Sequence, residues 1–237
     1  MSTIKLITLD LDNTLWDVDS IIIRAEQDMV AWIAEQAPAG LPVYQGDGMD
    51  KIRARVFEEF AHQRHDLSFM RTQVLWAVFQ HAGYPEREAR SLAEAAFAVF
   101  FEGRNRVEFF PGAEDMLEAL SQQFTVMALT NGNADIHRAG IGHYMAGAYS
   151  SADVGASKPH PDMFLAPLQA LDLQPRQGIH VGDHLIDDVG GAHGVGMHSI
   201  WVNLKEHALT DEDPRPTRTV TELNAVLQAI EEIATGA

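Results

Sequence analysis

The sequence predicts an α/β fold in which a parallel sheet forms a core domain and a block of helices is inserted as a second domain. Three observations support this prediction. Short apolar and β-branched runs alternate with helix patterns in the C-terminal half of the chain, as a parallel sheet with crossover helices requires. One further run of this kind lies at the N-terminus, and a long segment with helix patterns but no convincing strand follows it.

Each core element is expected from its local pattern. Runs of Ile, Val, Leu and Phe that are too short for helices are typical of strands buried on both faces. The expected strands cover residues 4–9, 124–129, 179–181 and 199–202. Helix patterns occupy the intervals between and after the later strands, at residues 112–122, 161–170, 188–194 and 220–234. Strand and helix therefore alternate along the core.

The inserted segment carries helical periodicity throughout. Helices are expected at residues 20–35, 50–62, 68–82 and 86–102. Pro111 and Gly112 mark the return of the chain to the sheet. We predict a core domain of residues 1–16 and 106–237 and a helical domain of residues 17–105. The alternative is that these helices pack on the sheet within one domain.

Composition narrows the class of partner. The 237 residues include 17 basic and 34 acidic side chains, for a formal net charge of -17. Such a charge repels nucleic acid and anionic membranes, so neither is an expected partner. There is no cysteine, which excludes disulfides and a thiolate nucleophile. The N-terminus lacks the apolar core of a secretory signal, and no apolar run is long enough to span a bilayer, so a soluble, cytoplasmic protein is expected.

The stretch ITLDLDNTLWD, residues 7–17, sets Asp10 and Asp12 directly after the first strand. Alternate side chains of an extended chain share a face, so both carboxylates are expected in the crevice at the carboxyl end of the sheet. Two like charges this close favour a bound cation or a proton on one of them. The pair is therefore a candidate cation site, or a nucleophile beside an acid. The alternative is a polar turn, with Asp12 and Asn13 as turn formers and Asp10 as a helix cap.

Two further polar clusters lie between predicted elements, the first of them directly after a predicted strand. Thr130, Asn131 and Gly132 offer a hydroxyl, an amide and backbone N–H groups that can hold an oxyanion. Lys158 lies in GASKPHPDMF just before a predicted helix, where its ammonium can offset carboxylates or a phosphate. Taken singly, the first cluster is a weak signal that a capped strand-to-helix turn also explains, and a single lysine is usually a solvated surface residue.

A last cluster, GDHLIDD, carries Asp183 after a strand and Asp187 and Asp188 at the start of a helix pattern. A third carboxylate at a strand end, beside Asp10 and Asp12, gives the oxygen-rich site that Mg²⁺ prefers. Asp187 and Asp188 are alternatively explained by the preference of acids for helix starts. Mg²⁺ is the expected cofactor.

Together, DLDNTL, LTNG, SKPHPDMF and GDHLIDD resemble, in order, the four motifs of the haloacid dehalogenase-like superfamily, and the helical insertion resembles the C1-type cap of its subfamily I. Within that superfamily the chain is similar to bacterial phosphatases of flavin mononucleotide (FMN) and of 5-amino-6-(5-phospho-D-ribitylamino)uracil. The resemblance implies a Rossmann-like core with a helical cap and a Mg²⁺-dependent phosphomonoester hydrolase. Its substrate would be a small phosphorylated metabolite such as FMN or another riboflavin-pathway phosphate.

The resemblance also implies roles for the acids. Asp10 would attack phosphorus and form an aspartyl phosphate. Asp12 would protonate the leaving oxygen and later activate water. Mg²⁺ would be held by Asp10, the main-chain carbonyl of Asp12 and Asp183, with support from Asp188 rather than Asp187.

Other implied roles concern substrate binding. Thr130 and the backbone at Asn131 would bind phosphoryl oxygens, and Lys158 would balance charge. Trp16 would stack on a substrate ring, or else pack at the junction of the domains. Arg71 resembles a substrate-binding arginine of the cap. The eleven histidines contain no metal-spaced set, although His184 follows Asp183 directly.

Competing functions remain open. A 2-haloacid dehalogenase of the same fold attacks carbon without Mg²⁺ and lacks an aspartate at the position of Asp12. A receiver-type phosphoacceptor domain uses similar residues, but it is shorter and has no helical insertion. A non-catalytic phosphate-binding protein is the third alternative. The protein is expected to act on a small phosphate ester as a monomer or homodimer.

Overall fold

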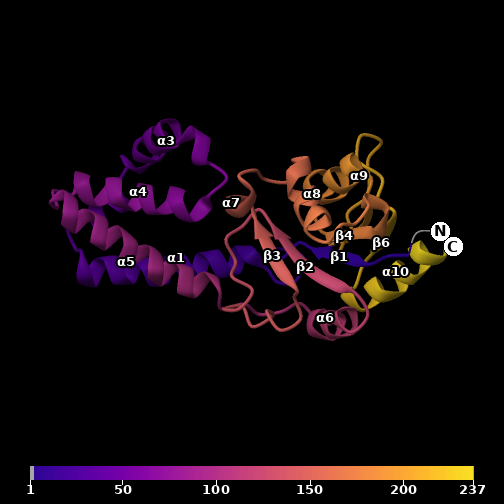
Figure 1. Ribbon diagram of the computed structural model, residues 1–237. Coiled ribbons are helices and arrows are strands. Elements are labelled where there is room, and N and C mark those ends of the chain that lie inside the picture. Colours follow the sequence, from indigo (N-terminus) through magenta and orange to yellow (C-terminus); the bar gives the residue numbers. More distant parts are fainter. Residues whose placement is uncertain (1–2, 237) are drawn as a thin grey trace. The chain divides into compact units, whose positions relative to one another are not determined.

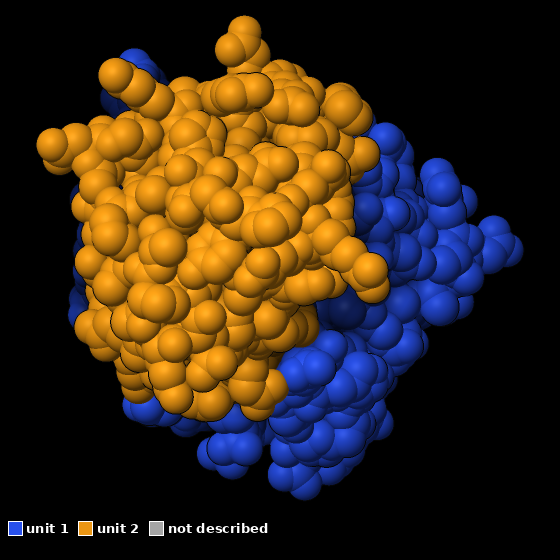
Figure 2. Space-filling view, turned by 90° about the vertical axis from the view of Figure 1, so that its left-hand side faces the viewer, with its two compact units in different colours: residues 1–17, 108–237 blue, residues 18–107 orange. Residues whose placement is uncertain are grey.

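The computed structural model describes residues 3–236, so residues 1–2 and 237, at the ends of the predicted core domain, lie outside the described part. The chain divides into two compact units, which Figure 2 colours separately. The core unit runs to Asp17 and resumes at Glu108, and the helical unit comprises Val18–Val107. Within the described residues, no helix is both long and apolar enough to cross a membrane.

The core unit contains a parallel sheet, which confirms the predicted α/β class. In the described chain the sheet has six strands in the order β3-β2-β1-β4-β5-β6, and every neighbouring pair is parallel. The strands are β1 (Leu6–Leu9), β2 (Thr125–Thr130), β3 (Gly147–Ser150), β4 (Gly178–Gly182), β5 (His198–Val202) and β6 (Arg218–Val220).

Helices cover both faces of this sheet, so its central strands are buried on both sides and read as continuous apolar runs. Figure 1 shows α8 and α9 on one face and α6 and α10 on the other. On the first face, Leu6 and Leu129 pack against Met163 and Phe164 of α8. The elements are α6 (Ala113–Ser121), α7 (Ser151–Val154), α8 (Pro161–Ala170), η2 (Pro175–Gln177), η3 (Leu185–Gly190), α9 (Gly191–Val195), η4 (Leu223–Ala225) and α10 (Val226–Thr235).

The helical unit has its own apolar core, built from side chains that recur at helical spacing, such as Ala25, Met29 and Ile33 of α1. At Gly103 an added Cβ would lie 2.9 Å from the Cα of Ala25, so glycine permits the close packing of α5 on α1. The elements are α1 (Val18–Gln36), α2 (Leu41–Tyr44), α3 (Met49–Glu59), η1 (Ala61–Gln63), α4 (Leu67–His81) and α5 (Glu86–Arg104).

Several elements differ from those expected. The edge strands β3 and β6 were not predicted, because their sequences GAYS and RTV are short and carry no apolar run. The short helix α2 was also missed. The helix expected at residues 188–194 begins earlier, as the π-helical turn η3, and continues as α9. The last helix starts at Val226, because β6 and η4 occupy the residues before it.

The sheet order determines where a site can form. From β1 the chain goes first to β2 and β3 on one side, and later to β4, β5 and β6 on the other. Such a reversal opens a crevice at the carboxyl ends of the two strands that flank the switch point. Leu9, the last residue of β1, pairs in register with Ala128 of β2 and Val181 of β4. Residues just beyond these three strands therefore meet at one edge.

Candidate active site

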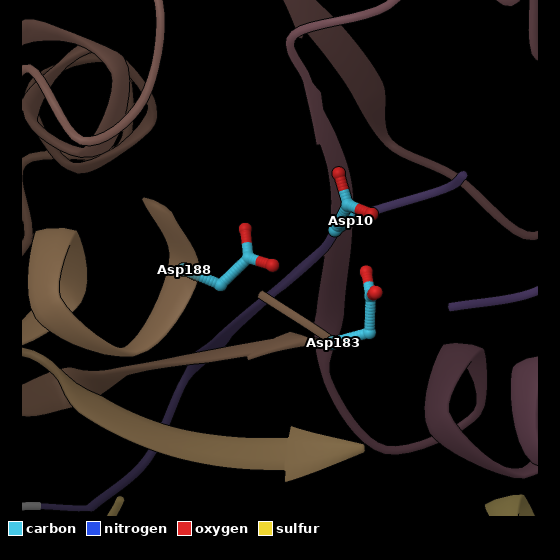
Figure 3. A group of neighbouring side chains, drawn as sticks. All are labelled: Asp10, Asp183 and Asp188. Atoms are coloured by element: carbon cyan, nitrogen blue, oxygen red, sulfur yellow. The ribbon is translucent and has the colours of Figure 1, made fainter. Parts of the chain in front are cut away.

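Three aspartates at this edge direct their carboxylates toward one another (Figure 3). Asp10 follows β1, Asp183 follows β4, and Asp188 lies in η3. One oxygen of each lies within 4.8 Å of the other two, close enough for all three to hold a metal ion. Gly182 permits this approach, since an added Cβ there would collide with the Asp188 carboxylate. An all-oxygen donor set of this kind fits Mg²⁺.

Lys158 lies among these carboxylates. Its Nζ donates to Asp10 Oδ1 at 2.6 Å, to Asp188 Oδ1 at 2.7 Å and to the carbonyl oxygen of Leu129 at 2.8 Å. An ammonium has three protons, so these bonds use all of its donors. The Lys158 side chain is only 2% exposed, and its ion pairs are therefore little weakened by solvent. The ammonium links the end of β1 to η3.

Burial and neighbouring charges shift the ionisation of the cluster. Burial raises the pKa of Asp10, and Asp188 and Asp183 add to the effect although Lys158 opposes it. Burial also favours the neutral form of Lys158, but Asp10 and Asp188 outweigh it and raise the lysine's pKa, so the lysine stays charged.

The other two carboxyls shift in opposite directions. Burial would raise the pKa of Asp188, yet Lys158 and His180 hold it below its usual range. Burial and Asp188 raise the pKa of Asp183 to about 6. One ammonium thus leaves the three carboxylates incompletely compensated, and a divalent cation would stabilise their ionised forms.

Thr14 connects two of the three acids. Its hydroxyl lies 3.1 Å from Asp10 Oδ2 and 3.3 Å from Asp183 Oδ1, as a donor shared between them. The side chain is fully buried. The preceding turn places Asn13 in the left-handed region, with a φ of 61°, which asparagine tolerates better than most residues. This turn brings a hydroxyl four residues after Asp10 back onto the acids.

Asp12 lines the same cavity as Asp10, while Leu11 between them is buried in the core. The indole Nε1 of Trp16 donates to Asp12 Oδ1 at 2.8 Å. Trp16 itself is fully buried and packs at a tilt against Phe109, with ring centroids 5.9 Å apart. Trp16 therefore orients Asp12, and its ring has no exposed face on which a substrate would stack.

Thr130 and Asn131 end β2 beside Lys158. The Thr130 hydroxyl accepts the Gly132 N–H at 2.9 Å and so shapes the turn. The Asn131 side chain pairs with both backbone groups of Lys158, accepting its N–H at 2.7 Å and donating to its carbonyl at 3.0 Å. The Asn131 side chain therefore positions the lysine loop, which leaves its backbone N–H as the group available to an oxyanion.

These groups surround a cavity of about 160 Å³ in the core unit. Its volume matches a phosphoryl-sized group rather than a whole metabolite. Apart from Gly132, the residues that line the cavity are polar or charged: Asp10, Asp12, Asn13, Thr130, Asn131, Gly132, Lys158, Asp183, His184, Asp187 and Asp188.

The structure separates the roles of the two neighbouring acids in η3. Asp188 is buried and belongs to the acidic triad, whereas Asp187 is half-buried and outside it. Asp187 Oδ2 makes long contacts, 3.5 Å to Asn131 Nδ2 and 3.6 Å to His184 Nδ1. Adjacent residues of a helical turn point in different directions, and in η3 it is Asp188 that faces the triad. His184 caps this turn by accepting the Asp187 N–H at 3.0 Å.

Arg71 belongs to the helical unit and is described there with its partners. Its Nη1 donates to Glu26 Oε2 at 2.7 Å, and its guanidinium lies 3.6 Å from the centre of the Phe100 ring. Tyr44 donates to the other oxygen of Glu26. About a third of the Arg71 side chain is exposed, so the guanidinium is held in place yet accessible.

Sequence reasoning missed two residues that contact the acids. The sequence gives no usable signal for Thr14, because its hydroxyl reaches the two acids only through the turn at Asn13. His180 had a weak signal, as a titratable residue inside an otherwise apolar strand. Its imidazole bonds Asp188, and burial lowers its pKa although Asp188 opposes the shift.

Comparison with known proteins gives the same family from two directions. A family model described as haloacid dehalogenase-like hydrolase matches residues 4–196. The 5-amino-6-(5-phospho-D-ribitylamino)uracil phosphatase YigB of Escherichia coli K12 is 31% identical over 202 residues, which cover 85% of this chain and 84% of that protein. A ribulose-1,5-bisphosphate 5-phosphatase of Halopiger xanaduensis is 30% identical over 70% of this chain and 67% of its own.

A solved structure extends the match to the whole fold. A protein of Pseudomonas syringae pv. tomato DC3000 named as a 2-haloacid dehalogenase superposes with a TM-score of 0.93 and 39% identity, covering 97% of this chain and 99% of that one. Two classes of activity are thus named among the relatives, hydrolysis of phosphate esters and removal of halide. The matched model, the shared identity and the common fold show that the chain belongs to the haloacid dehalogenase-like hydrolase family.

Proposed function

We propose that the protein is a Mg²⁺-dependent phosphomonoester hydrolase that works through an aspartyl phosphate on Asp10. The observation that carries the proposal is the cavity wall, in which Asp10 lies beside Lys158 and within reach of Asp183 and Asp188, with Asp12 on the same wall. A nucleophile, an acid, a fixed ammonium and a cation site are the groups that phosphoryl transfer uses.

In the first step a carboxylate oxygen of Asp10 forms a bond to phosphorus as the bond from phosphorus to the ester oxygen breaks. Asp12 gives its proton to that departing oxygen, so the alcohol leaves neutral. Trp16 holds the Asp12 carboxyl at the cavity wall for this transfer. Lys158, fixed by Asp188, places positive charge against Asp10 while negative charge gathers on the phosphoryl oxygens.

In the second step Asp12, now ionised, takes a proton from water, and the water oxygen bonds to phosphorus. The bond between phosphorus and Asp10 breaks, inorganic phosphate leaves, and Asp12 has regained its proton. Thr130 and Asn131 line the cavity where phosphoryl oxygens would lie, and the Thr130 hydroxyl and the Asn131 backbone N–H are the proposed donors to those oxygens. Such donors stabilise the equatorial oxygens in both steps.

Asp10, Asp183 and Asp188 would hold Mg²⁺, together with the main-chain carbonyl of Asp12. When bound, the cation supplies charge neutralisation and polarises a phosphoryl oxygen. Thr14, which bonds both Asp10 and Asp183, keeps two of the carboxylates oriented toward it.

The proposed substrate is a small phosphate ester. The protein is proposed to act on it in the cytoplasm, as a monomer or homodimer. The core cavity accommodates the phosphoryl group, and the helical unit, including Arg71, is proposed as a cap that selects the rest. FMN and the riboflavin-pathway phosphate of the relative YigB are the first substrates to test. Initial rates against these, ribulose bisphosphate and aryl phosphates would rank them, and a flat profile would contradict a dedicated riboflavin role.

A 2-haloacid dehalogenase is the second candidate, because the similar Pseudomonas syringae protein carries that name. In that reaction Asp10 would attack carbon and displace halide, with no leaving oxygen to protonate. Asp12 on the cavity wall has no use as an acid in such chemistry, although it could activate the water that hydrolyses the ester formed on Asp10, and the reaction needs no triad of acids that suits a cation. Both features favour phosphorus as the atom attacked.

Parallel assays separate the two candidates. Phosphate release from p-nitrophenyl phosphate is measured in Mg²⁺ and in chelator, and halide release from 2-chloropropionate in chelator. We expect phosphate release that requires Mg²⁺, and no halide. Asp10→Asn should abolish phosphate release, while exposed Asp17→Asn, a matched acid beyond the cavity, should leave it unchanged. Halide release in chelator, or near-normal phosphate release by Asp10→Asn, would disprove the proposal.

A further inference from the structure

A buried imidazole lies behind the acidic triad and is not used by the reaction described above. His180 belongs to β4, and only 1% of the residue is exposed. Its Nε2 lies 3.0 Å from Asp188 Oδ1, and its Nδ1 lies 2.8 Å from the hydroxyl of Thr8 on the neighbouring strand β1. Phe164 contacts the ring edge-on, with centroids 5.1 Å apart. Both nitrogens therefore have partners, and the ring is confined.

The identity of the partners determines which nitrogen carries the proton. A carboxylate only accepts, so Nε2 must donate to Asp188. In the neutral ring Nδ1 is then an acceptor, and Thr8 must donate to it. The geometry agrees, because the Thr8 hydroxyl is 2.8 Å from Nδ1 and a longer 3.4 Å from the carbonyl of Ile179. Hydrogen bonds thus run in one direction, from Thr8 through His180 to Asp188.

This chain completes the support of Asp188. Its Oδ1 accepts from His180 and from Lys158, and its Oδ2 accepts the backbone N–H of His184 at 2.9 Å. A carboxylate held at both oxygens cannot rotate freely. Asp188 in turn fixes the ammonium of Lys158, which contacts Asp10 at 2.6 Å. A displacement of His180 would therefore shift Asp188, then Lys158, and through them change the contact at Asp10.

We propose that His180, oriented by Thr8, is a positioning residue that holds Asp188 and Lys158 in the geometry needed at Asp10. It touches neither the phosphoryl cavity nor the reacting atoms. The expected effect of His180 on catalysis rests on the proposed phosphatase function. The expected effect of His180 on cation binding, and the tautomer of its ring, do not depend on that function.

The core unit provides a matched control. Ser199 is as buried as Thr8, and its hydroxyl lies 2.9 Å from Nε2 of His193. Ser199 pairs in register with His180 across β4 and β5, but the side chains of Ser199 and His193 make no hydrogen bond to the acidic triad within the described residues. The Ser199 hydroxyl also accepts the N–H of Thr217 at 3.2 Å, so its loss tests what removing a buried hydroxyl beside β4 does without breaking the bonds of His180.

The experiment compares the full-length wild type with Thr8→Val, His180→Gln, His180→Ala and Ser199→Ala. Steady-state kinetics with p-nitrophenyl phosphate give kcat and KM, and calorimetric titration with Mg²⁺ gives metal affinity. Loss of a residue that orients metal ligands typically costs about 10- to 100-fold in metal affinity or activity. We expect a fall of this size in kcat and Mg²⁺ affinity for His180→Ala, a smaller fall for Thr8→Val, and an unchanged KM.

His180→Gln keeps an N–H donor near Asp188 and should recover most of the loss, and Ser199→Ala should match the wild type in both readouts. If His180→Ala does not fold, Thr8→Val, which conserves side-chain volume, carries the test. Equal kcat and Mg²⁺ affinity in wild type and Thr8→Val, or equal losses in Thr8→Val and Ser199→Ala, would overturn the proposal. Failure of His180→Gln to improve on a folded His180→Ala would also overturn it.

A third readout is independent of catalysis and of metal. The ¹⁵N shifts of the imidazole ring report its tautomer, and the proposal requires protonation of Nε2 and an acceptor at Nδ1. Protonation at Nδ1 instead would refute the chain of bonds. If the wild type hydrolyses no phosphate ester, the proposed function fails, while the Mg²⁺ titration and ring shifts still decide the role of His180.

Discussion

Replacing Lys158 with methionine removes the ammonium that bonds both Asp10 and Asp188 and preserves much of the side chain's length. All three residues are buried, so the two carboxylates cannot recover their lost partner from bulk water. Removal of one member of a buried ion pair costs about 3–5 kcal/mol, because an uncompensated charge remains. For a protein of this size each kcal/mol lowers Tm by roughly 2–4 °C, so Lys158→Met should unfold roughly 6–20 °C below the wild type.

The assay is thermal and urea unfolding at neutral pH, in chelator and in excess Mg²⁺. We expect Mg²⁺ to restore more stability to Lys158→Met than to the wild type, because the cation replaces the missing positive charge. Exposed Lys205→Met is the control and should change stability by less than about 0.5 kcal/mol. If Lys158→Met is as stable as Lys205→Met in chelator, the carboxylates do not depend on the lysine and the reasoning fails.

Three other predictions concern neighbouring groups. Burial raises the pKa of Asp183 from its ordinary value of 3.8 to about 6, so the folded protein binds this proton more tightly than the unfolded chain does. Without metal, the stability that the protonated carboxyl contributes is therefore lost as pH rises through that window. In chelator at neutral pH, Asp183→Asn should thus be more stable than the wild type by about 1–2 kcal/mol, after allowance for partial exposure, and Mg²⁺ should no longer raise its Tm. A Tm below that of the wild type in chelator would contradict this. Thr14→Val removes the donor shared by Asp10 and Asp183 and should weaken Mg²⁺ binding about tenfold by calorimetry, with no change counting against it. Trp16→Phe removes the donor to Asp12 and should lower kcat for an aryl phosphate about tenfold with KM unchanged, whereas a raised KM at constant kcat would mean that Trp16 binds substrate.

The central strands were predictable from sequence, and the edge strands were not. Leu6, Ile7 and Leu9 are all fully buried, so the sequence of β1 is the nearly continuous apolar run that is typical of a strand covered on both faces. In β3, by contrast, GAYS is half-exposed and pairs with β2 alone, so packing places little demand on its side chains. The same reasoning applies to β6 at the opposite edge.

The acids of the candidate site were predictable because the carboxyl ends of adjacent parallel strands meet. Asp10 and Asp183 follow strands that pair in register, so their meeting depends on topology alone. Asp188 required more, since which of two adjacent acids faces inward depends on where the helical turn η3 begins, and the structure leaves Asp187 outside the triad. The choice of Asp188 came from the family resemblance, and the geometry gives its physical reason.

The supporting residues could not be predicted, because their roles depend on packing across the sheet. His180 reaches Asp188 only because β4 lies beside β1 and Phe164 confines the ring. The sequence left two roles open for Trp16, stacking on a substrate ring or packing at the junction of the domains; in the structure it is fully buried and donates to Asp12. Burial of a single aromatic side chain cannot be inferred from its position after a motif.

The most direct test of the account is to trap the phosphoryl group on Asp10. In Asp12→Asn the base that activates water is missing, while p-nitrophenolate is a leaving group good enough to depart without an acid. Mixing this variant with p-nitrophenyl phosphate and Mg²⁺ should give a burst of one nitrophenolate per protein. Borohydride reduction should then convert residue 10 to homoserine, detected by peptide mass spectrometry. A burst with the phosphoryl group on another residue, or steady phosphate release at the wild-type rate without any adduct, would contradict the proposed mechanism.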